Sequence, residues 1–128
     1  MKERLSQARL ATLRGRLTLP SYDRSRIETG IVHFGPGAFH RVHQAWFMEQ
    51  LLGADPRWGI CGVSLRNRDV RDALMSQDCL YTLAIRDEAT AYQVIGSIRE
   101  VLFAMEQQSQ VLERLAAPAT RLVTITVT

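Results

Sequence analysis

The stretch Gly30-Ile-Val-His-Phe-Gly-Pro-Gly-Ala-Phe-His-Arg-Val-His-Gln44 decides the fold of this chain. Apolar residues before its glycines indicate a buried strand over 31–34. Apolar residues after the glycines recur at helical spacing and indicate an amphipathic helix over 38–52. The sequence therefore predicts a strand, a tight turn at Gly35-Pro36-Gly37, and a helix.

The turn from Gly35 to Gly37 is a candidate phosphate-binding site. Such a turn exposes the backbone N–H groups that open the following helix, whose N-terminus carries a partial positive charge. Glycine is expected at both positions because a side chain would hold a phosphate away and could not adopt positive φ. The dinucleotide fingerprint Gly-x-Gly-x-x-Gly/Ala, however, has His40 at its third small position. By pattern alone, a pyrophosphate cradle and an ordinary turn are equally good interpretations.

The residues that follow favour the first interpretation. Gly35-Pro-Gly-Ala-Phe-His-Arg-Val-His-Gln44 resembles the signature of the long-chain polyol dehydrogenases, the mannitol dehydrogenase family, in which Gly-x-Gly precedes Phe-His-Arg and His-Gln. Two later segments resemble the same family in the same order: Trp58-Gly-Ile-Cys-Gly-Val-Ser-Leu-Arg66 and Gln77-Asp-Cys-Leu-Tyr-Thr-Leu83. The resemblance runs from about Leu19 to the last residue. It implies an α/β, Rossmann-like, mostly parallel sheet with flanking helices, and a nicotinamide dinucleotide as partner.

A second strand is predicted over 58–65, because its nearly continuous apolar character suits a parallel strand covered on both faces. Ligands bind such sheets at the carboxyl ends of the strands. An acidic residue past the second strand accepts hydrogen bonds from the adenosine ribose and repels the 2′-phosphate of NADP, and Asp69 is the candidate. It lies further beyond Gly37 than the roughly 20 positions of the compact fingerprint. Asp69 could equally be the N-cap of a helix over 70–76.

Arg66 and Arg68 complicate the choice of cofactor, because an arginine in this loop can pair with a 2′-phosphate. Where several members of the resembled family carry a second acidic residue, this chain has Arg68. We therefore expect NAD, with NADP as an alternative. The expected cofactor-binding residues are Gly35, Pro36, Gly37, Ala38, Phe39, His40, Arg41, Arg66 and Asp69.

The histidines have other possible roles. His40 and His43 would share one helix face and could ligate a metal there, but no third ligand of the right type accompanies them. We expect His40 and Arg41 to hold the nucleotide or the packing around it, and His43 to pack against a neighbouring segment. His33 should be a hydrogen-bonded core residue. No histidine has the partner of a general base, and no metal site is predicted.

Composition bounds the remaining possibilities. With 128 residues, of which 46% are hydrophobic and 23% charged, the chain is expected to fold as one soluble domain. The net charge of +3 comes from dispersed arginines, so nucleic acid is not expected as a partner. No apolar run approaches the roughly 20 residues of a membrane span. The N-terminus also lacks a signal peptide core, so a cytoplasmic location is expected. Cys61 and Cys79 should be buried, reduced thiols.

The rest of the chain is predicted to contain both helices and strands. We expect an antiparallel hairpin, inserted in the parallel scheme, where two strand patterns flank a short polar segment. The predicted elements are a short helix or arm over 3–14, a polar connection over 21–27, strands over 80–86 and 91–98, a helix over 106–116, and a strand over 121–128.

The final strand predicts that the chain is part of a longer protein, because a β-branched core strand should lead into a loop over the ligand. We expect 1–128 to be an incomplete N-terminal NAD(P)-binding domain, with 1–29 as an arm and connection. In the resembled family a later helical domain supplies the catalytic lysine, the asparagine and histidine beside it, and most of the polyol pocket. This chain has no lysine besides Lys2, so no catalytic residue is assigned.

The resemblance implies reversible hydride transfer between a sugar alcohol or aldonate and a nicotinamide ring. Mannitol, arabinitol, mannonate and altronate-type compounds are all candidate substrates, and each would require the missing domain. The chain alone is expected to be inactive. The alternative is a non-catalytic nucleotide-binding or interaction module.

Overall fold

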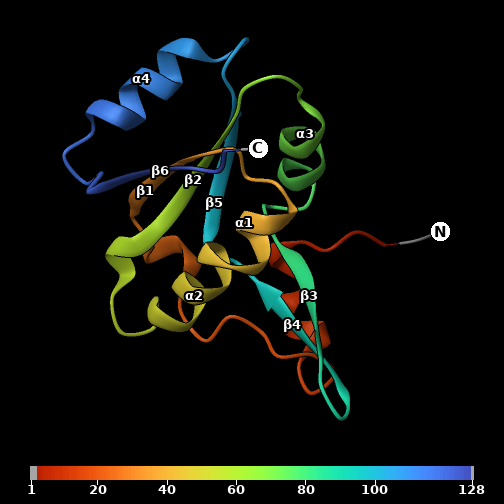
Figure 1. The fold of residues 1–128 in the computed structure, drawn as a ribbon. Coiled ribbons are helices and arrows are strands. Elements are labelled where there is room, and N and C mark those ends of the chain that lie inside the picture. The colour runs from red at the N-terminus through yellow and green to blue at the C-terminus, as the bar shows by residue number, and fades with distance from the viewer. Residues whose placement is uncertain (1–2, 128) are drawn as a thin grey trace.

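A four-stranded parallel sheet in the order β5-β2-β1-β6 forms the centre of the computed structural model, which describes residues 3–127 (Figure 1). Parallel pairing joins β1 to β2 on one side and to β6 on the other. The first two predicted strands are therefore neighbours, and the Rossmann-like α/β prediction is confirmed. The strands of this sheet are β1 (Thr29–Phe34), β2 (Gly59–Ser64), β5 (Ile98–Phe103) and β6 (Leu122–Ile125).

Helices cover both faces of this sheet (Figure 1). On one face, Ile31 and Ile60 pack in a buried cluster with residues of α2 (Gln44–Leu51) and α3 (Asp69–Met75). On the other face, Val32 and Cys61 pack with Val111 of α4 (Gln108–Ala116). Successive strand residues alternate between the two clusters, as the pleat of a sheet requires. Both faces of β1 and β2 are therefore apolar, which explains their continuous apolar sequence.

The single helix predicted over 38–52 is wrong in one respect, because it is broken at His43 into α1 (Ala38–Val42) and α2. His43 has φ −114° and ψ −91°, which are not helical values. Its ring Nδ1 lies 2.7 Å from the carbonyl oxygen of Phe39, the acceptor that a continuous helix would offer to the His43 N–H. The side chain thus competes for a backbone hydrogen bond and interrupts the helix.

The predicted hairpin is confirmed as β3 (Tyr81–Arg86) and β4 (Thr90–Ile95), which form a separate two-stranded antiparallel sheet. The N-terminal arm extends this sheet, since the Thr18 N–H donates to the carbonyl of Tyr92 at 3.1 Å. Instead of an α-helix, the arm contains the 3₁₀ turn η1 (Gln7–Leu13). Two further 3₁₀ turns, η2 (Arg24–Arg26) and η3 (Pro56–Trp58), directly precede β1 and β2 in the chain.

The sequence analysis missed β5, because it predicted one strand over 91–98, which combines β4 with the first residue of β5. The chain bends at Gly96 and Ser97 and then enters the parallel sheet. A Cβ at Gly96 would lie 2.8 Å from Nε of Arg24, whose guanidinium donates to the Gly96 carbonyl at 3.1 Å. The glycine therefore marks the boundary between the hairpin and the parallel sheet.

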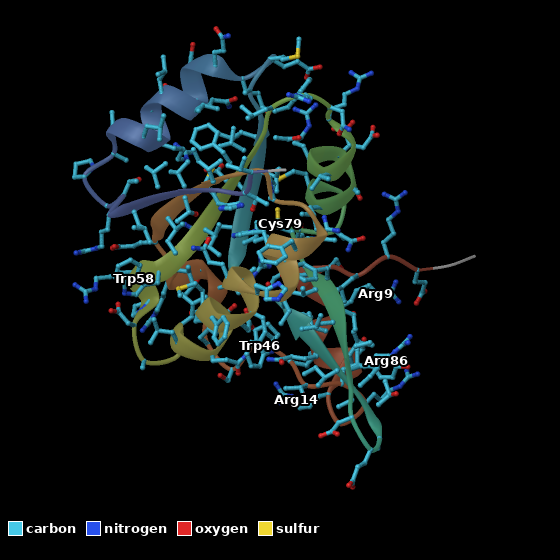
Figure 2. The ribbon with its side chains drawn as sticks, in the orientation of Figure 1. Arg9, Arg14, Trp46, Trp58, Cys79 and Arg86 are labelled. Carbon is cyan, nitrogen blue, oxygen red and sulfur yellow. The ribbon has the colours of Figure 1, made fainter. Side chains whose placement is uncertain are left out.

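The remaining sequence expectations concern cysteines, arginines and membrane spans. Cys61 and Cys79 are buried free thiols, as predicted. Figure 2 places Arg14 and Arg86 near the hairpin, away from the carboxyl ends of the parallel strands. Within residues 3–127, no helix combines the length and apolar character needed to cross a membrane.

Candidate functional site

A cavity of about 340 Å³ lies where the parallel strands β1, β2 and β6 end. The strand order changes direction here, because β2 lies on one side of β1 and β6 on the other. Such a switch point is where open α/β sheets bind ligands. The ends of the two predicted strands are thus brought together. The cavity is lined by Gly35, Pro36, Gly37, Ala38, Phe39, Ser64, Arg66, Asn67, Val70 and Thr126.

Gly35 holds the sharp turn from β1 toward the cavity. Its φ of +90° lies in a region that residues with a Cβ rarely adopt. Its N–H donates to the Val63 carbonyl at 3.0 Å, which fixes the turn to the end of β2. The expectation that this position needs the freedom of glycine is therefore confirmed.

Gly37 requires a different explanation. Its φ is −78°, which any residue can adopt, so the expected positive φ at this position is wrong. A Cβ built there meets no described atom within 4 Å. The protein itself therefore leaves space beside Gly37, and that space is part of the cavity lining.

Gly62, in the middle of β2, packs against the turn through Pro36. The sequence analysis did not identify this residue. A Cβ at Gly62 would lie 2.9 Å from both Cβ and Cγ of Pro36, so Pro36 rests directly on the strand. An isolated glycine inside a strand often marks such a close approach. That signal could have identified Gly62.

The first turn of α1 presents backbone donors beside the cavity. Among the hydrogen bonds of residues 3–127, none has the N–H of Ala38, Phe39 or His40 as its donor. The Arg41 guanidinium donates to the Pro36 carbonyl at 3.3 Å and so holds the turn from the other side. These donors can receive an anionic ligand at the helix start.

His33 and His40 form a stacked pair beneath the turn. Their ring centroids are 3.6 Å apart with an interplanar angle of 7°, and the residues are only 3% and 2% exposed. His33 Nδ1 lies 2.6 Å from Oγ1 of Thr124, and Nε2 lies 2.9 Å from Oγ1 of Thr126. The expected core role of His33 is confirmed, and the pair connects β1, β6 and α1.

His40 therefore supports the packing around the cavity from within the core. Its Nε2 lies 2.8 Å from Oε1 of Gln44, while its buried Nδ1 has no partner among the described residues. Burial and the nearby ring of His33 lower the pKa of His40 to about 4. Burial also lowers the pKa of His33. Both rings are neutral at pH 7.

His43 does not share a face with His40, contrary to the sequence expectation. The break between α1 and α2 leaves His43 exposed, with its ring stacked on Phe39 at a centroid distance of 4.2 Å. Over the described part of the chain, no group of three or more His, Cys, Asp or Glu residues could hold a metal ion.

The loop after β2 carries the other predicted residues. Arg66 is exposed and lines the cavity. The N-cap hypothesis for Asp69 is wrong, because Asp69 is the first residue of α3 and follows the N-cap residue Arg68. Asn67 instead accepts the Asp69 N–H with its side-chain oxygen at 3.1 Å.

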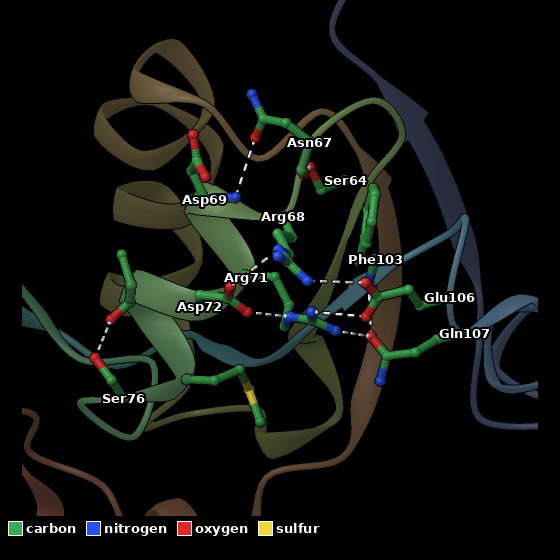
Figure 3. Close-up of polar contacts among 12 residues, drawn as sticks. Ser64, Asn67, Arg68, Asp69, Arg71, Asp72, Ser76, Phe103, Glu106 and Gln107 are labelled. Carbon is green, nitrogen blue, oxygen red and sulfur yellow. Dashed lines mark hydrogen bonds and ion pairs between the residues drawn. The ribbon is translucent and has the colours of Figure 1, made fainter.

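Asp69 lies beside the cavity at the end of β2. It lines a neighbouring space of about 490 Å³, which shares Ala38 and Val70 with that cavity. Its carboxylate is exposed and has no hydrogen bond or ion pair within the part of the chain that the structure describes. Figure 3 shows it pointing away from Arg68, whose guanidinium pairs with Glu106 at 3.4 Å. The side chains of Asp69, the candidate for binding the ribose, and Arg68, a candidate for binding a 2′-phosphate, thus point in different directions.

Comparison with known proteins agrees with this geometry. The model of the mannitol dehydrogenase Rossmann domain matches residues 29–128. The chain belongs to the mannitol dehydrogenase family. It is 42% identical to mannitol dehydrogenase DSF1 of Saccharomyces cerevisiae over 97% of its own length and 26% of that protein. It is 41% identical to a mannitol 2-dehydrogenase of Pyricularia oryzae over 88% of its length and 23% of the relative.

Two solved structures have the same fold. A D-sorbitol dehydrogenase in substrate-free form matches with a TM-score of 0.91 and 35% identity, over 98% of this chain and 27% of that one. The Pseudomonas fluorescens mannitol 2-dehydrogenase in ternary complex with NAD and D-mannitol matches with a TM-score of 0.89 and 37% identity. That match covers 97% of this chain and 26% of the other. The chain thus spans about a quarter of the length of the proteins that it matches.

Proposed function

We propose that this chain is the NAD-binding portion of an oxidoreductase that transfers a hydride between a sugar alcohol or aldonate and a nicotinamide cofactor. One observation carries the proposal: the cavity at the switch point is lined by the turn Gly35-Pro36-Gly37, which lies within the segment that the family model matches. A neighbour with 37% identity has been solved with NAD and D-mannitol. The proposal assigns the NAD role to residues 29–128, with the preceding residues as an arm and connection.

The pyrophosphate is proposed to lie against the turn and the first turn of α1. The backbone donors of Ala38 and Phe39 are available there, and the space beside Gly37 admits an atom group where a side chain would stand. The exposed guanidinium of Arg66 lines the same cavity and adds positive charge for a phosphate. The residues present therefore fit a dinucleotide.

The adenosine ribose is proposed to lie toward Asp69. A carboxylate that is exposed and without a protein partner can accept hydrogen bonds from ribose hydroxyls, and its charge disfavours a 2′-phosphate. NAD is thus the proposed cofactor, with NADP bound more weakly. Pro36, His40 and Arg41 are proposed to contribute to cofactor binding by holding the turn in place, without contacting the ribose.

The nicotinamide ring would supply the hydride chemistry, and the residues of this chain would bind and orient the dinucleotide. We assign no catalytic residue to the chain. Mannitol, arabinitol, mannonate and altronate-type compounds remain the proposed substrates, and their recognition is proposed to require residues beyond these. We expect no polyol-dependent NADH formation by the 128-residue chain alone.

The test is thermal unfolding of the purified chain with NAD and NADP titrated in parallel. At about 100 times its dissociation constant, a ligand stabilises the folded state by roughly 2.7 kcal/mol. Gly37→Val should abolish the stabilisation by NAD while leaving the unbound fold intact, because its backbone is extended and its surroundings are open.

Gly53→Val is the matched control. A Cβ at Gly53 would meet only Oγ of Ser21, at 3.7 Å, and Gly53 does not line the cavity. This variant should keep the full response to NAD. Cooperative unfolding with no response to NAD in the wild-type chain, or an equal loss of response in both variants, would contradict the proposal.

A further inference from the structure

Two loops meet at the ribose side of the site, and they follow neighbouring strands. Parallel pairing aligns Ser64 of β2 with Phe103 of β5, and the Ala104 N–H donates to the Ser64 carbonyl at 2.9 Å. The loop over 65–68 therefore lies beside the turn over 104–107. Any ribose or phosphate bound at the end of β2 is close to both.

Glu106 joins these two loops through its carboxylate (Figure 3). One oxygen lies 3.4 Å from Nη1 of Arg68, and the other lies 3.0 Å from Nη2 of Arg71. A single acidic side chain in the β5–α4 turn thus holds two arginines of the β2–α3 region.

The two arginines depend on Glu106 to different degrees. The Arg71 side chain is 17% exposed and is also held by Asp72 at 2.6 Å and by Gln107 at 2.8 Å. The Arg68 side chain is 62% exposed, and within residues 3–127 its only other ion pair is with Asp72, at 3.8 Å. Loss of Glu106 would therefore leave Arg68 with only the long, exposed pair to Asp72, whereas Arg71 would stay anchored.

Arg68 is the arginine of this loop that is adjacent to Asp69 in the chain, so a turn of its side chain would bring its charge toward a 2′-phosphate. It directly precedes Asp69, and its neighbours Arg66 and Asn67 line the cavity. Its guanidinium now points to the β5–α4 turn, away from Asp69 (Figure 3). An arginine bound to a carboxylate has its charge compensated and its donors engaged, so it is a poor partner for a phosphate.

We propose that Glu106 is a specificity-determining residue that disfavours NADP by holding Arg68 away from the ribose 2′ position. This inference rests on the proposed dinucleotide function. Cofactor choice then has two contributions. Asp69 accepts hydrogen bonds from the ribose hydroxyls and repels a 2′-phosphate, whereas Glu106 keeps the Arg68 guanidinium away from that phosphate. The preference for NAD over NADP then depends partly on Glu106 in the β5–α4 turn, which lies in a different loop from Asp69.

The test compares NAD and NADP dissociation constants, measured by calorimetric titration, for the wild-type chain, Glu106→Gln, Arg68→Gln and the double variant. Glu106→Gln should tighten NADP binding by about fivefold, the effect of roughly 1 kcal/mol from one exposed ion pair, and should change NAD binding by less than about twofold. Arg68→Gln in the Glu106→Gln background should remove the gain.

Glu113→Gln is the matched control, because it removes the same charge from an exposed position of α4 that lines neither cavity. It should leave the ratio of the two dissociation constants unchanged. A gain that survives in the double variant, or that Glu113→Gln reproduces, would show a general charge effect and overturn the inference. If the wild-type chain binds NAD but Glu106→Gln has an unchanged NADP dissociation constant, the inference is overturned and the proposed function stays intact. Failure of the folded wild-type chain to bind NAD would overturn both.

Discussion

The two sides of the cavity are built in different ways. The turn at Gly35–Gly37 rests on buried groups: Pro36 lies on Gly62, and the His33–His40 stack lies beneath the turn. The loop over 65–69 is exposed throughout and is held by surface hydrogen bonds and ion pairs. One side is thus part of the hydrophobic core, and the other is part of the surface.

This difference separates the two tasks of the proposed site. Pyrophosphate binding needs a fixed backbone, and a close-packed core supplies one because its atoms have little room to move. Cofactor preference depends on a few charges, and exposed charges can be exchanged at little cost in stability. Substitutions under the turn should therefore change folding, whereas substitutions in the loop should change ligand binding.

Lowering the pH should have the largest effect on the buried side of the cavity, because it protonates His40 beneath the turn. Because the folded-state pKa of His40 is about 4, against 6.5 in the unfolded chain, the unfolded state binds the proton first as the pH falls. The stability that neutral His40 supports is complete above pH 6.5 and is lost as the pH falls toward 4. At about 1.4 kcal/mol per pKa unit, we expect a loss of roughly 3 kcal/mol, measured by urea unfolding across this range.

His40→Phe isolates this contribution, because it keeps an aromatic ring and removes the titrating group. Burial raises the pKa of Glu49, so its contribution has the opposite sign: it is present at low pH and is lost as the pH rises through that raised pKa. The difference between the wild-type and His40→Phe slopes removes Glu49 from the comparison. Parallel slopes for the two proteins would show that the stacked pair does not make the turn sensitive to acid.

Gly62→Ala should give the next largest effect. The added Cβ would lie 2.9 Å from two carbon atoms of the rigid Pro36 ring, so the turn must shift or the strand must bend. Overpacking of this kind costs about 1–3 kcal/mol, which urea unfolding at pH 7 would detect. Gly37→Ala is the control, because its Cβ meets no described atom within 4 Å and its stability should change by less than about 1 kcal/mol. Equal stability of the two variants would mean that Pro36 does not rest on β2.

The sequence predicted the parts of this site that depend on local pattern. Apolar runs and glycines located β1, the turn and β2, and the rule that ligands bind at the carboxyl ends of strands brought Gly35 and Arg66 to one cavity. These signals are local because a strand, a turn and a helix each impose their own spacing on a short segment.

The remainder depends on contacts between distant segments. The His33–His40 stack forms only because α1 folds back over β1, and its hydroxyl partners Thr124 and Thr126 come from the far end of the chain. The helix break at His43 follows from one side-chain contact with the Phe39 carbonyl. No periodicity in the sequence records such contacts, so these features could be found only in the folded structure.

Asp69→Asn should weaken NAD binding without unfolding the protein. Loss of charge-assisted hydrogen bonds to the ribose is expected to raise the NAD dissociation constant about tenfold, equivalent to roughly 1.4 kcal/mol. Stability should change by only a few tenths of a kcal/mol, because the carboxylate is exposed in the first turn of α3. Asp87→Asn, in the exposed β3–β4 turn, is the control in the same calorimetric titration and should leave NAD binding unchanged. Unaltered binding by Asp69→Asn would remove this residue from the proposed ribose site.

Arg68→Gln should have the smallest effect on folding. Its ion pairs, with Glu106 at 3.4 Å and Asp72 at 3.8 Å, lie on the surface, where such pairs contribute about 0–1 kcal/mol. Arg71→Gln offers an internal comparison, since Arg71 bonds Gln107 and lies over the Phe103 ring at 5.7 Å. Urea unfolding should show a clearly larger loss for Arg71→Gln. If Arg68→Gln proves equally destabilising, the loop after β2 is fixed as firmly as the turn after β1, and cofactor preference cannot be altered there independently of folding.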